Sequence, residues 1–491
     1  MAVSLVSTGV QFPDSTIQTT AAGTLPSFTA SGSISAGAVV GINSDGTVST
    51  ITGASAAQGA STYYPGPGIA YQATGAVNDT GSTILIFQQT TETGSPGKLY
   101  AGTISGTAIT FGTGVSLGNS IAYASIMYCP AQGVFVVSYG PSGGVRCVSV
   151  SGTTITLGTA LTGLGVAGSY IGLASDCNGS TIFGVGKESG TNYAQLRAFT
   201  VSGTTITAGG TLQLTNGGNN IGGYAGRCAY ATNSSSSLVC ATYYNTSNGY
   251  TYYSFATYSG GTFTIGTSDN VQISNNGSFA TVTYSITKDC FILSYSTTLR
   301  VLTYSGTTGT LGTTTTPGYS AADYYAPSAQ YNNAGDRLCA AFYSGSTEVF
   351  FYIYTVDATA RTLTLEQTFT PYSGAAGSQM GAVFCSTSTS KSQLTANTFV
   401  QFRDGNNNGF RAETLSYSTR GNAIGIAQST VSSSASVNVK VVGDIDSNQS
   451  GLTTGSDYYI GTTGTISTTA ATGFKIGKAL SATRLLITQN A

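Results

Sequence analysis

The sequence predicts an all-β protein, and three features of its composition indicate this class. Hydrophobic residues make up 40% of the 491 residues, which is enough for a core, whereas charged residues make up only 7%. Thr, Tyr, Val and Ile favour strands, and the abundant Gly, Asn and Ser favour the turns between them. No stretch has the sustained 3.6-residue apolar periodicity of an amphipathic helix.

A repeated phrase divides the middle of the chain into units. Each copy reads as the end of a strand, a Ser-Gly turn and a returning strand. The copies are ISGTAITFGT from residue 104, VSGTTITLGT from 150, VSGTTITAGG from 201, YSGGTFTIGT from 258, YSGTTGTLGT from 304 and a diverged VDATARTLTL from 356. Within one unit, residues 168–214 contain four short strands joined by Gly-, Asn- and Ser-rich connections. Four antiparallel strands in about 50 residues match the size of a propeller blade.

The number of units predicts a seven-bladed β-propeller. First strands recur near residues 68, 120, 169, 223, 278, 324 and 378. Continuous apolar runs at 133–139 and 290–295 fit strands that neighbouring blades cover on both faces. Six and eight blades are the alternative counts. A stacked β-solenoid is the alternative architecture, although its repeats are usually shorter.

The last unit predicts how the ring closes. This unit stops after its third strand, near residue 420, so its fourth strand must come from elsewhere. Residues 43–55 (NSDGTVSTITGAS) precede the first unit and have the same turn-then-strand pattern. We therefore expect residues 43–55 to complete the seventh blade, which removes exposed strand edges from an uncharged β protein.

Cysteine and histidine usage restricts the chemistry of the chain. The sequence has no histidine, so Ser/His and Cys/His nucleophile pairs and the commonest metal ligand are excluded. The eight cysteines lack CxxC spacing and mostly lie in apolar runs, which indicates buried free thiols and assembly in a reducing cytoplasm. They are Cys129, Cys147, Cys177, Cys228, Cys240, Cys290, Cys339 and Cys385.

Charge and motif content disfavour several classes of ligand. The net charge of −1 leaves no basic face for nucleic acid, and no apolar run is long enough to span a membrane or act as a signal sequence. No glycine-rich phosphate loop precedes a helix, so we expect no cofactor. Asp444, Asp446 and Asn448 have the alternating spacing of a calcium loop but lack its final Glu, so we interpret this segment as a turn and expect no metal.

Paired carboxylates could still hydrolyse a glycan, so a glycosidase is an alternative function. The acidic residues are mostly isolated in loops and do not recur at equivalent positions of neighbouring blades, which favours a protein that is not an enzyme. They are Glu92, Asp176, Glu188, Asp269, Asp323, Asp336, Glu348 and Glu366.

Tyrosine-rich and asparagine-rich segments are the candidate binding surface. Tyr presents an apolar ring and a hydroxyl to glycans or proteins, although most tyrosines of a β protein serve strands and blade interfaces. The candidates lie in two segments, 241–258 and 403–409. They are Tyr243, Tyr244, Tyr250, Tyr252, Asp404, Asn406 and Asn407.

The two flanks carry a resemblance to bacteriophage structural proteins. The segments SISAGAVVGINSDGTVS, AIGIAQSTVSSSASVNVKVVGDI, GLTTGSDYYIGTTGTIST and KIGKALSATRLLI resemble a small β-sandwich or barrel module of tail fibres and capsid decoration proteins. In that module an early strand pairs with the later IGIA strand. The resemblance therefore implies that the propeller is inserted into the module, between about residues 55 and 420.

The N-terminal segment VQFPDSTIQTTAA is similar to the phrase FPDGTVQTTA of phage tail and fibre proteins, with Asp14-Ser15 in place of Asp-Gly. An isolated hairpin is marginally stable in water, so we expect this one to become ordered by pairing with a partner. A disordered tail without a role is the alternative. The expected attachment residues are Val10, Phe12, Pro13, Asp14 and Ile17.

Four segments follow from these observations. We expect an attachment segment at 1–27, the first part of the module at 28–55, the propeller at 56–419 and the rest of the module at 420–491. The resemblance implies a non-enzymatic virion protein, a tail or head fibre that contacts the host surface or another virion protein. It also implies assembly in the host cytoplasm and a homo-oligomer, typically a trimer, although no coiled-coil heptad is present. A capsid decoration protein is the alternative.

Overall fold

The computed structural model consists of strands and one short 3-10 helix, η1 (Pro130–Gln132). It describes residues 4–6, 9–11, 17–18, 25–42, 46–51, 57–58, 62–63, 73–88, 97–105, 108–118, 124–140, 144–164, 172–175, 180–188, 190–191, 193–214, 227–231, 237–245, 247–274, 280–295, 298–316, 328–332, 337–343, 349–369, 382–384, 398–404, 410–416, 423–460, 465–468 and 475–488. The chain divides into two compact units, residues 56–417 and residues 1–55 with 418–491.

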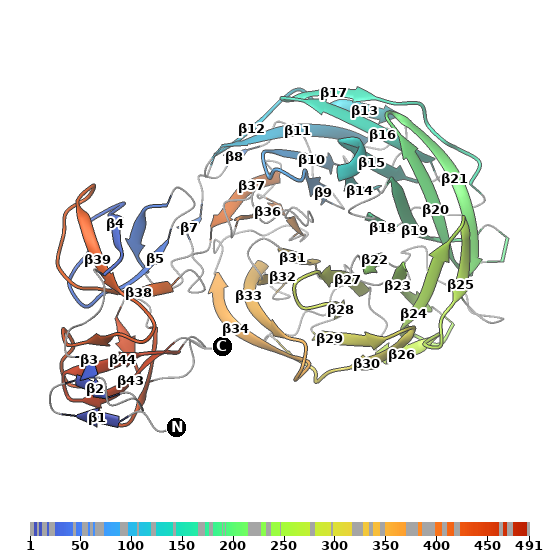
Figure 1. Ribbon diagram of the computed structural model, residues 1–491. Coiled ribbons are helices and arrows are strands. Elements are labelled where there is room, and N and C mark those ends of the chain that lie inside the picture. The colour runs from blue at the N-terminus through green and yellow to red at the C-terminus, as the bar shows by residue number, and fades with distance from the viewer. Residues whose placement is uncertain are drawn as a thin grey trace. The chain divides into compact units, whose positions relative to one another are not determined.

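Unit 56–417 is a ring of seven antiparallel sheets, which confirms the predicted propeller (Figure 1). Blade 1 contains β9 (Ala73–Val77), β10 (Thr83–Gln88), β11 (Gly97–Ser105), β12 (Ala108–Phe111) and β13 (Val115–Gly118). Blade 2 contains β14 (Ala124–Cys129), β15 (Val134–Tyr139), β16 (Gly144–Ser151) and β17 (Thr154–Leu157). Blade 3 contains β18 (Gly172–Ser175), β19 (Thr181–Lys187), β20 (Ala194–Ser202) and β21 (Thr205–Gln213).

The remaining four blades follow the same order. Blade 4 contains β22 (Arg227–Ala231), β23 (Leu238–Asn245), β24 (Tyr250–Ser259), β25 (Thr262–Ile265) and β26 (Val271–Ser274). Blade 5 contains β27 (Ala280–Ser285), β28 (Cys290–Tyr295), β29 (Thr298–Ser305) and β30 (Thr308–Leu311). Blade 6 contains β31 (Ser328–Asn332), β32 (Arg337–Tyr343), β33 (Val349–Asp357) and β34 (Thr362–Phe369). Blade 7 contains β35 (Ala382–Phe384), β36 (Thr398–Asp404) and β37 (Phe410–Ser416), completed by β7 (Ala57–Gln58) and β8 (Thr62–Tyr63).

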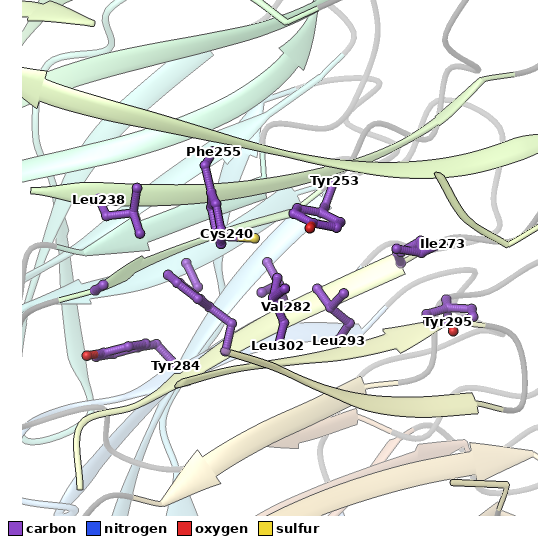
Figure 2. Close-up of a cluster of buried hydrophobic side chains, with 14 residues drawn as sticks. Leu238, Cys240, Tyr253, Phe255, Ile273, Val282, Tyr284, Leu293, Tyr295 and Leu302 are labelled. Carbon is purple, nitrogen blue, oxygen red and sulfur yellow. The ribbon is translucent and has the colours of Figure 1, made fainter. Parts of the chain in front are cut away.

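The first strands of the blades form the inner ring. Each first strand contacts the first strand of the next blade, and β35 of blade 7 returns to β9 of blade 1. The cores lie between blades because each strand sends alternate side chains to the two neighbouring blades. In β23, Val239 and Ala241 pack with blade 3, whereas Leu238 and Cys240 pack with blade 5 (Figure 2). This packing on both faces explains the continuous apolar runs in the sequence.

The blade interiors also contain cysteine thiols. Cys129, Cys147, Cys240, Cys290 and Cys339 are buried and form no disulfide, as predicted. Burial, followed by the nearby Cys129, raises the pKa of the Cys147 thiol to about 11. Cys177 and Cys385 lie outside the described residues, and the side chain of Cys228 is not described.

The repeated phrase forms the hairpin between the third and fourth strands. In blade 2, Ser151 pairs with Thr154 across a two-residue turn, and Gly152 has a φ of 59°. A positive φ at the first central position, with none at the second, Thr153, is the pattern of a type II′ turn, which glycine adopts without strain. The Ser-Gly of the phrase is therefore a turn requirement.

The second glycine of the phrase brings neighbouring blades into contact. A Cβ atom on Gly158, after the outer strand of blade 2, would lie 2.5 Å from the carbonyl oxygen of Thr204 in the turn of blade 3. The same close approach occurs at four further seams. The glycines are Gly112 against Thr153, Gly210 against Gly261, Gly266 against Thr307 and Gly312 against Arg361. One phrase thus encodes both the turn and its docking site on the preceding blade.

We expect Gly158→Ala to lower the free energy of unfolding by about 1–3 kcal/mol, the usual effect of overpacking, because backbone atoms oppose the new methyl group. Chemical denaturation of the full chain measures this change. Thr159→Ala, at the adjacent exposed residue, is the matched control and should leave stability nearly unchanged. Equal stability of the two variants would contradict the docking role of Gly158.

The ring closes through an N-terminal segment, but the prediction that residues 43–55 form the closing strand was wrong. Residues 57–58 and 62–63, the strands β7 and β8, pair with β37 at Leu415–Ser416 and Arg411–Ala412. β6 (Val48–Thr50) instead pairs with β5 (Val39–Ile42), and Val48 is fully buried in the core of the other unit. The apolar side chain at position 48 therefore commits that strand to the small module.

Unit 1–55 with 418–491 contains two five-stranded sheets that share a core. The first sheet has the order β4-β39-β38-β5-β6, and the second has the order β40-β44-β43-β41-β42. Val39 and Ile426 of the first sheet pack with Ile460 and Leu485 of the second, as in a β-sandwich. Strands not yet given are β4 (Ser27–Thr29), β38 (Ala423–Ala427), β39 (Ser436–Lys440), β40 (Ile445–Asp446), β41 (Asp457–Ile460), β42 (Ile466–Ser467), β43 (Lys475–Ser481) and β44 (Arg484–Ile487).

Two strand pairings join the two chain segments of this module, β39 with β4 and β38 with β5. β38, which contains the IGIA sequence, pairs antiparallel with β5, with Ile426 opposite Val39. This confirms the pairing that the resemblance implied. The module is therefore built from both flanks of the propeller, and the propeller is an insertion between β6 and β38.

The N-terminal segment forms a three-stranded sheet of β1 (Ser4–Val6), β2 (Gly9–Gln11) and β3 (Ile17–Gln18). The predicted hairpin is present, with Val10 opposite Gln18 and Gln11 opposite Ile17. β1 was not predicted. Phe12, Pro13 and Asp14 lie outside the described residues.

Candidate binding surface

The antiparallel order of the strands gives the propeller two distinct ends. In each blade the second strand ends where the third begins, so these ends gather on one side of the ring, here called the BC face. The turns between first and second strands, and the repeated hairpins, gather on the opposite side, here called the AB face. Candidate residues can therefore be assigned to a face from the strand in which they lie.

The structure places both candidate segments on the BC face. Tyr243, Tyr244, Tyr250 and Tyr252 lie at the ends of β23 and β24 in blade 4, and Asp404 ends β36 in blade 7. Blades 4 and 7 are not neighbours in the ring, so the two segments form separate sites. Asn406 and Asn407, and the side chain of Asp404, lie outside the described residues.

Strand register determines which face of blade 4 each tyrosine of the hairpin occupies. Tyr243 lies opposite Tyr252, and Asn245 lies opposite Tyr250, so these four side chains share one face of the sheet. That face packs against blade 3. Tyr250 and Tyr252 are partly exposed at the BC end of this seam. Tyr244 is partly exposed and belongs to the other face of the sheet.

Tyr243 is not a surface residue, which corrects its assignment to the binding surface. Its side chain is 1% exposed because it packs in the apolar cluster between blades 3 and 4. Burial, opposed in part by its hydrogen bond with Ser254, raises the pKa of the Tyr243 hydroxyl. Its ring stacks on Tyr252, with centroids 5.9 Å apart and planes at 19°. Tyr243 therefore packs against the Tyr252 ring from the neighbouring strand.

A polar network fixes Tyr243 in turn. The Tyr243 hydroxyl donates to Asn270 Oδ1 and lies 3.1 Å from Ser254 Oγ. Ser254 Oγ donates to Asp269 Oδ1 at 2.8 Å, and Asn270 Nδ2 donates to Asp269 Oδ2 at 2.8 Å. Asn270 has a φ of 52°, a left-handed conformation that Asn tolerates better than most residues. The acid Asp269 is thus a structural ligand of this network.

A second cluster lies on the AB face and was not predicted. One carboxylate oxygen of Asp289 accepts hydrogen bonds from the hydroxyls of Tyr284 and Tyr304. Burial, followed by the hydrogen bond to Asp289, raises the pKa of both tyrosines. Tyr128 occupies the same register in blade 2, where burial and then Asp79 raise its pKa to about 12. In blade 5 these contacts tie the turn between first and second strands to its own blade, whereas Tyr128 of blade 2 interacts with Asp79 in the corresponding turn of blade 1.

In the segment considered as a calcium loop, an acidic residue is paired with a lysine. Asp446 is fully buried, and Lys440 Nζ lies 3.7 Å from its Oδ1. Gln449 Nε2 donates to Asp446 Oδ2 at 2.6 Å and to the carbonyl oxygen of Gly37 at 3.1 Å. The carboxylate of Asp446 therefore has a lysine and an amide of the chain itself as partners. Gln449 also connects the two chain segments of the module.

Several acids considered for hydrolysis have structural partners. Glu366 accepts from Arg337 Nε at 2.8 Å within blade 6, and Glu188 accepts from Thr191 and Gln195 within blade 3. Glu92, Asp176, Asp323, Asp336 and Glu348 lie outside the described residues. Among described residues, no group of three or more Cys, Asp or Glu side chains is placed to hold a metal ion. None of the described helices is long and apolar enough to cross a membrane.

Comparison with known proteins identifies no family. No family model and no curated protein matches the sequence. Solved structures that resemble the chain include a Lactobacillus plantarum protein, with 14% identity and a TM-score of 0.45 over 60% of this chain and 83% of that one. Saccharomyces cerevisiae Sqt1 has 9% identity and a TM-score of 0.43, covering 74% of this chain and all of its own. The Dos1 propeller has 12% identity and a TM-score of 0.45, covering 74% and 95%. The chain has a β-propeller fold. At these identities the likenesses say nothing about its function.

Proposed function

We propose that this chain is a non-enzymatic structural protein of a bacteriophage virion, a fibre or appendage. Its propeller contacts the host surface or another virion protein. The proposal rests on the flanking segments, which resemble virion proteins, because propellers serve many functions and the fold alone cannot select one.

The observation that carries this proposal is the pairing of β5 with β38 across the inserted propeller. The resemblance requires an early strand to pair with IGIA, and the two strands are separated by the whole propeller in sequence. An insertion of this kind leaves a small module as the base and presents the propeller as a separate unit. That arrangement suits an appendage with one attached part and one contacting part.

The BC face of the propeller is the contacting surface in this proposal. In blade 4 it carries the partly exposed Tyr244, Tyr250 and Tyr252, a side-chain type that gives large contact area with little entropy loss. Residues 228–268, which include β23 to β25, contain no charged side chain. Recognition by this blade therefore depends on aromatic and hydroxyl groups. The N-terminal sheet, with copies of itself or another virion protein, provides attachment.

Imaging of particles tests the proposal. Antibody label directed at the propeller should lie on tails or projecting fibres, and the purified full-length chain should bind host cells. Even label over the capsid without cell binding would instead favour a decoration protein. Release of sugars from host polysaccharide by the purified chain would favour the hydrolase. Absence of label from every particle would remove the virion assignment.

A further inference from the structure

We propose that the seam between blades 3 and 4, at the BC face, binds an uncharged saccharide. This inference rests on the proposed role in surface contact and names the ligand class and the residues. Tyr250 and Tyr252 are the contact residues, and Tyr243 is a positioning residue that acts through Tyr252.

The first argument is the shared register of the side chains. Because Tyr243 pairs with Tyr252 and Asn245 with Tyr250, three aromatic rings and one amide share a single face of blade 4. Tyr252 also packs on the apolar cluster that contains Leu196 and Leu214 of blade 3. The two partly exposed rings therefore lie where two blades meet, side by side at the BC end. Pyranose rings present C–H faces that pack on aromatic rings of this kind.

The second argument is that Tyr252 is held in place before any ligand arrives. The Tyr243 ring stacks on the Tyr252 ring with centroids 5.9 Å apart, and Asn248 Nδ2 donates to the Tyr252 hydroxyl at 2.8 Å. Tyr243 is itself held by Ser254 and Asn270. A contact ring that is already fixed loses little conformational entropy on binding, which favours affinity.

The third argument is a buried polar group beneath the exposed rings. Asn245 is fully buried, and its Oδ1 accepts from the backbone N–H of Ser247 at 2.9 Å. Its Nδ2 makes no hydrogen bond with the described part of the chain. Buried donors are rarely left unpaired in folded proteins. The donor lies on the same face as Tyr250, so a ligand hydroxyl bound at this seam would supply its missing acceptor.

The fourth argument is the absence of charge, which selects a neutral ligand. Residues 228–268 have no Asp, Glu, Lys or Arg, so the blade 4 hairpin itself offers no counter-ion for a sulfated or acidic sugar. The nearby acids are engaged, because Asp269 accepts hydrogen bonds from Ser254 and Asn270, and Glu188 accepts them from Thr191 and Gln195. Lys187 ends β19 at the BC end of blade 3 and is the cation on that side of the seam. The contact rings and the amide of the hairpin are uncharged, and such groups recognise uncharged polyhydroxyl compounds.

Binding of the full-length chain to immobilised oligosaccharides tests the inference. The panel contains neutral gluco-, galacto- and manno-oligosaccharides together with sialylated, sulfated and uronic-acid oligosaccharides. We expect neutral members to bind, and Tyr252→Ala to weaken binding by about 30-fold, as for an interface hot spot. Thr264→Ala, at an exposed position in the outer strand β25 of the same blade, is the matched control and should bind as the unmodified chain does. Thermal melting verifies that both variants fold.

The positioning role of Tyr243 has its own readout. Tyr243→Leu removes the stacked ring and should weaken saccharide binding, but it should cause no further loss when Tyr252 is already Ala. A purely structural role would weaken binding in both backgrounds.

Three results would overturn the inference: binding restricted to acidic sugars, an unchanged affinity of the Tyr252→Ala variant, or host-cell binding without binding to any neutral sugar. The last result would leave the proposed function intact. A chain that binds neither sugars nor cells, and labels no particle, would remove both proposals.

Discussion

Replacing residues 57–63 by a Gly/Ser segment of equal length is expected to open the propeller. The replacement preserves the chain length but removes the side chains and strand preference of β7 and β8, which complete blade 7 against β37. Each lost hydrogen bond costs about 1 kcal/mol, and the last blade also loses its outer cover. Hydrogen exchange should therefore rise first in β35 to β37 and in β9, the neighbouring strand of blade 1.

The matched control is a Gly/Ser replacement of β6, residues 48–50. Val48 is buried in the module and β6 pairs with β5, so this change should accelerate exchange in β5 and β38 while the blades stay protected. The two replacements thus test which N-terminal segment closes the ring. Faster exchange in blade 7 from the β6 replacement, with no effect from the 57–63 replacement, would contradict the closure seen here.

The blade architecture could be predicted because residues that each blade needs for its turn and its packing recur at regular intervals in the sequence. Gly152 and Gly158 recur in the units of blades 2 to 5 because each of these blades has a positive φ at its hairpin and a close approach to the next blade. The closing strand could not be predicted in the same way. β7 and β8 have two residues each, which is too few to show any periodicity. Residues 48–50 resemble the repeated phrase in sequence, but Val48 belongs to the core of the other unit.

The candidate surface was predictable at the level of a segment and not at the level of each side chain. Tyrosine density identified the blade 4 hairpin, but the depth of Tyr243 depends on strand register, which density does not report. The Asp289 cluster gave no local signal, because Tyr284 and Tyr304 meet it from two different strands. The contacts of Asp446 with Lys440 and Gln449 likewise appear only when the turn is folded.

Asp446→Ala is expected to destabilise the module by about 3–5 kcal/mol, because it leaves Lys440 buried without its counter-charge. It also removes the acceptor that holds Gln449, whose amide reaches Gly37 in the other chain segment. The loss should therefore loosen the union of the two flanks, and exchange at β5 and β38 should rise. Chemical denaturation of the full chain, with exchange measured in both units, gives the size and location of the effect.

A double-mutant cycle separates this pair from general damage to the turn. Replacing both charges, as Lys440→Met with Asp446→Leu, should recover much of the stability that Asp446→Ala loses, because well-packed apolar residues substitute for a buried ion pair at little cost. Asp444→Ala, in the same turn, removes only the acceptor for the Val441 N–H and should cost about 1 kcal/mol. If Asp446→Ala were no worse than Asp444→Ala, the buried pair would not be what holds the two flanks of the propeller together.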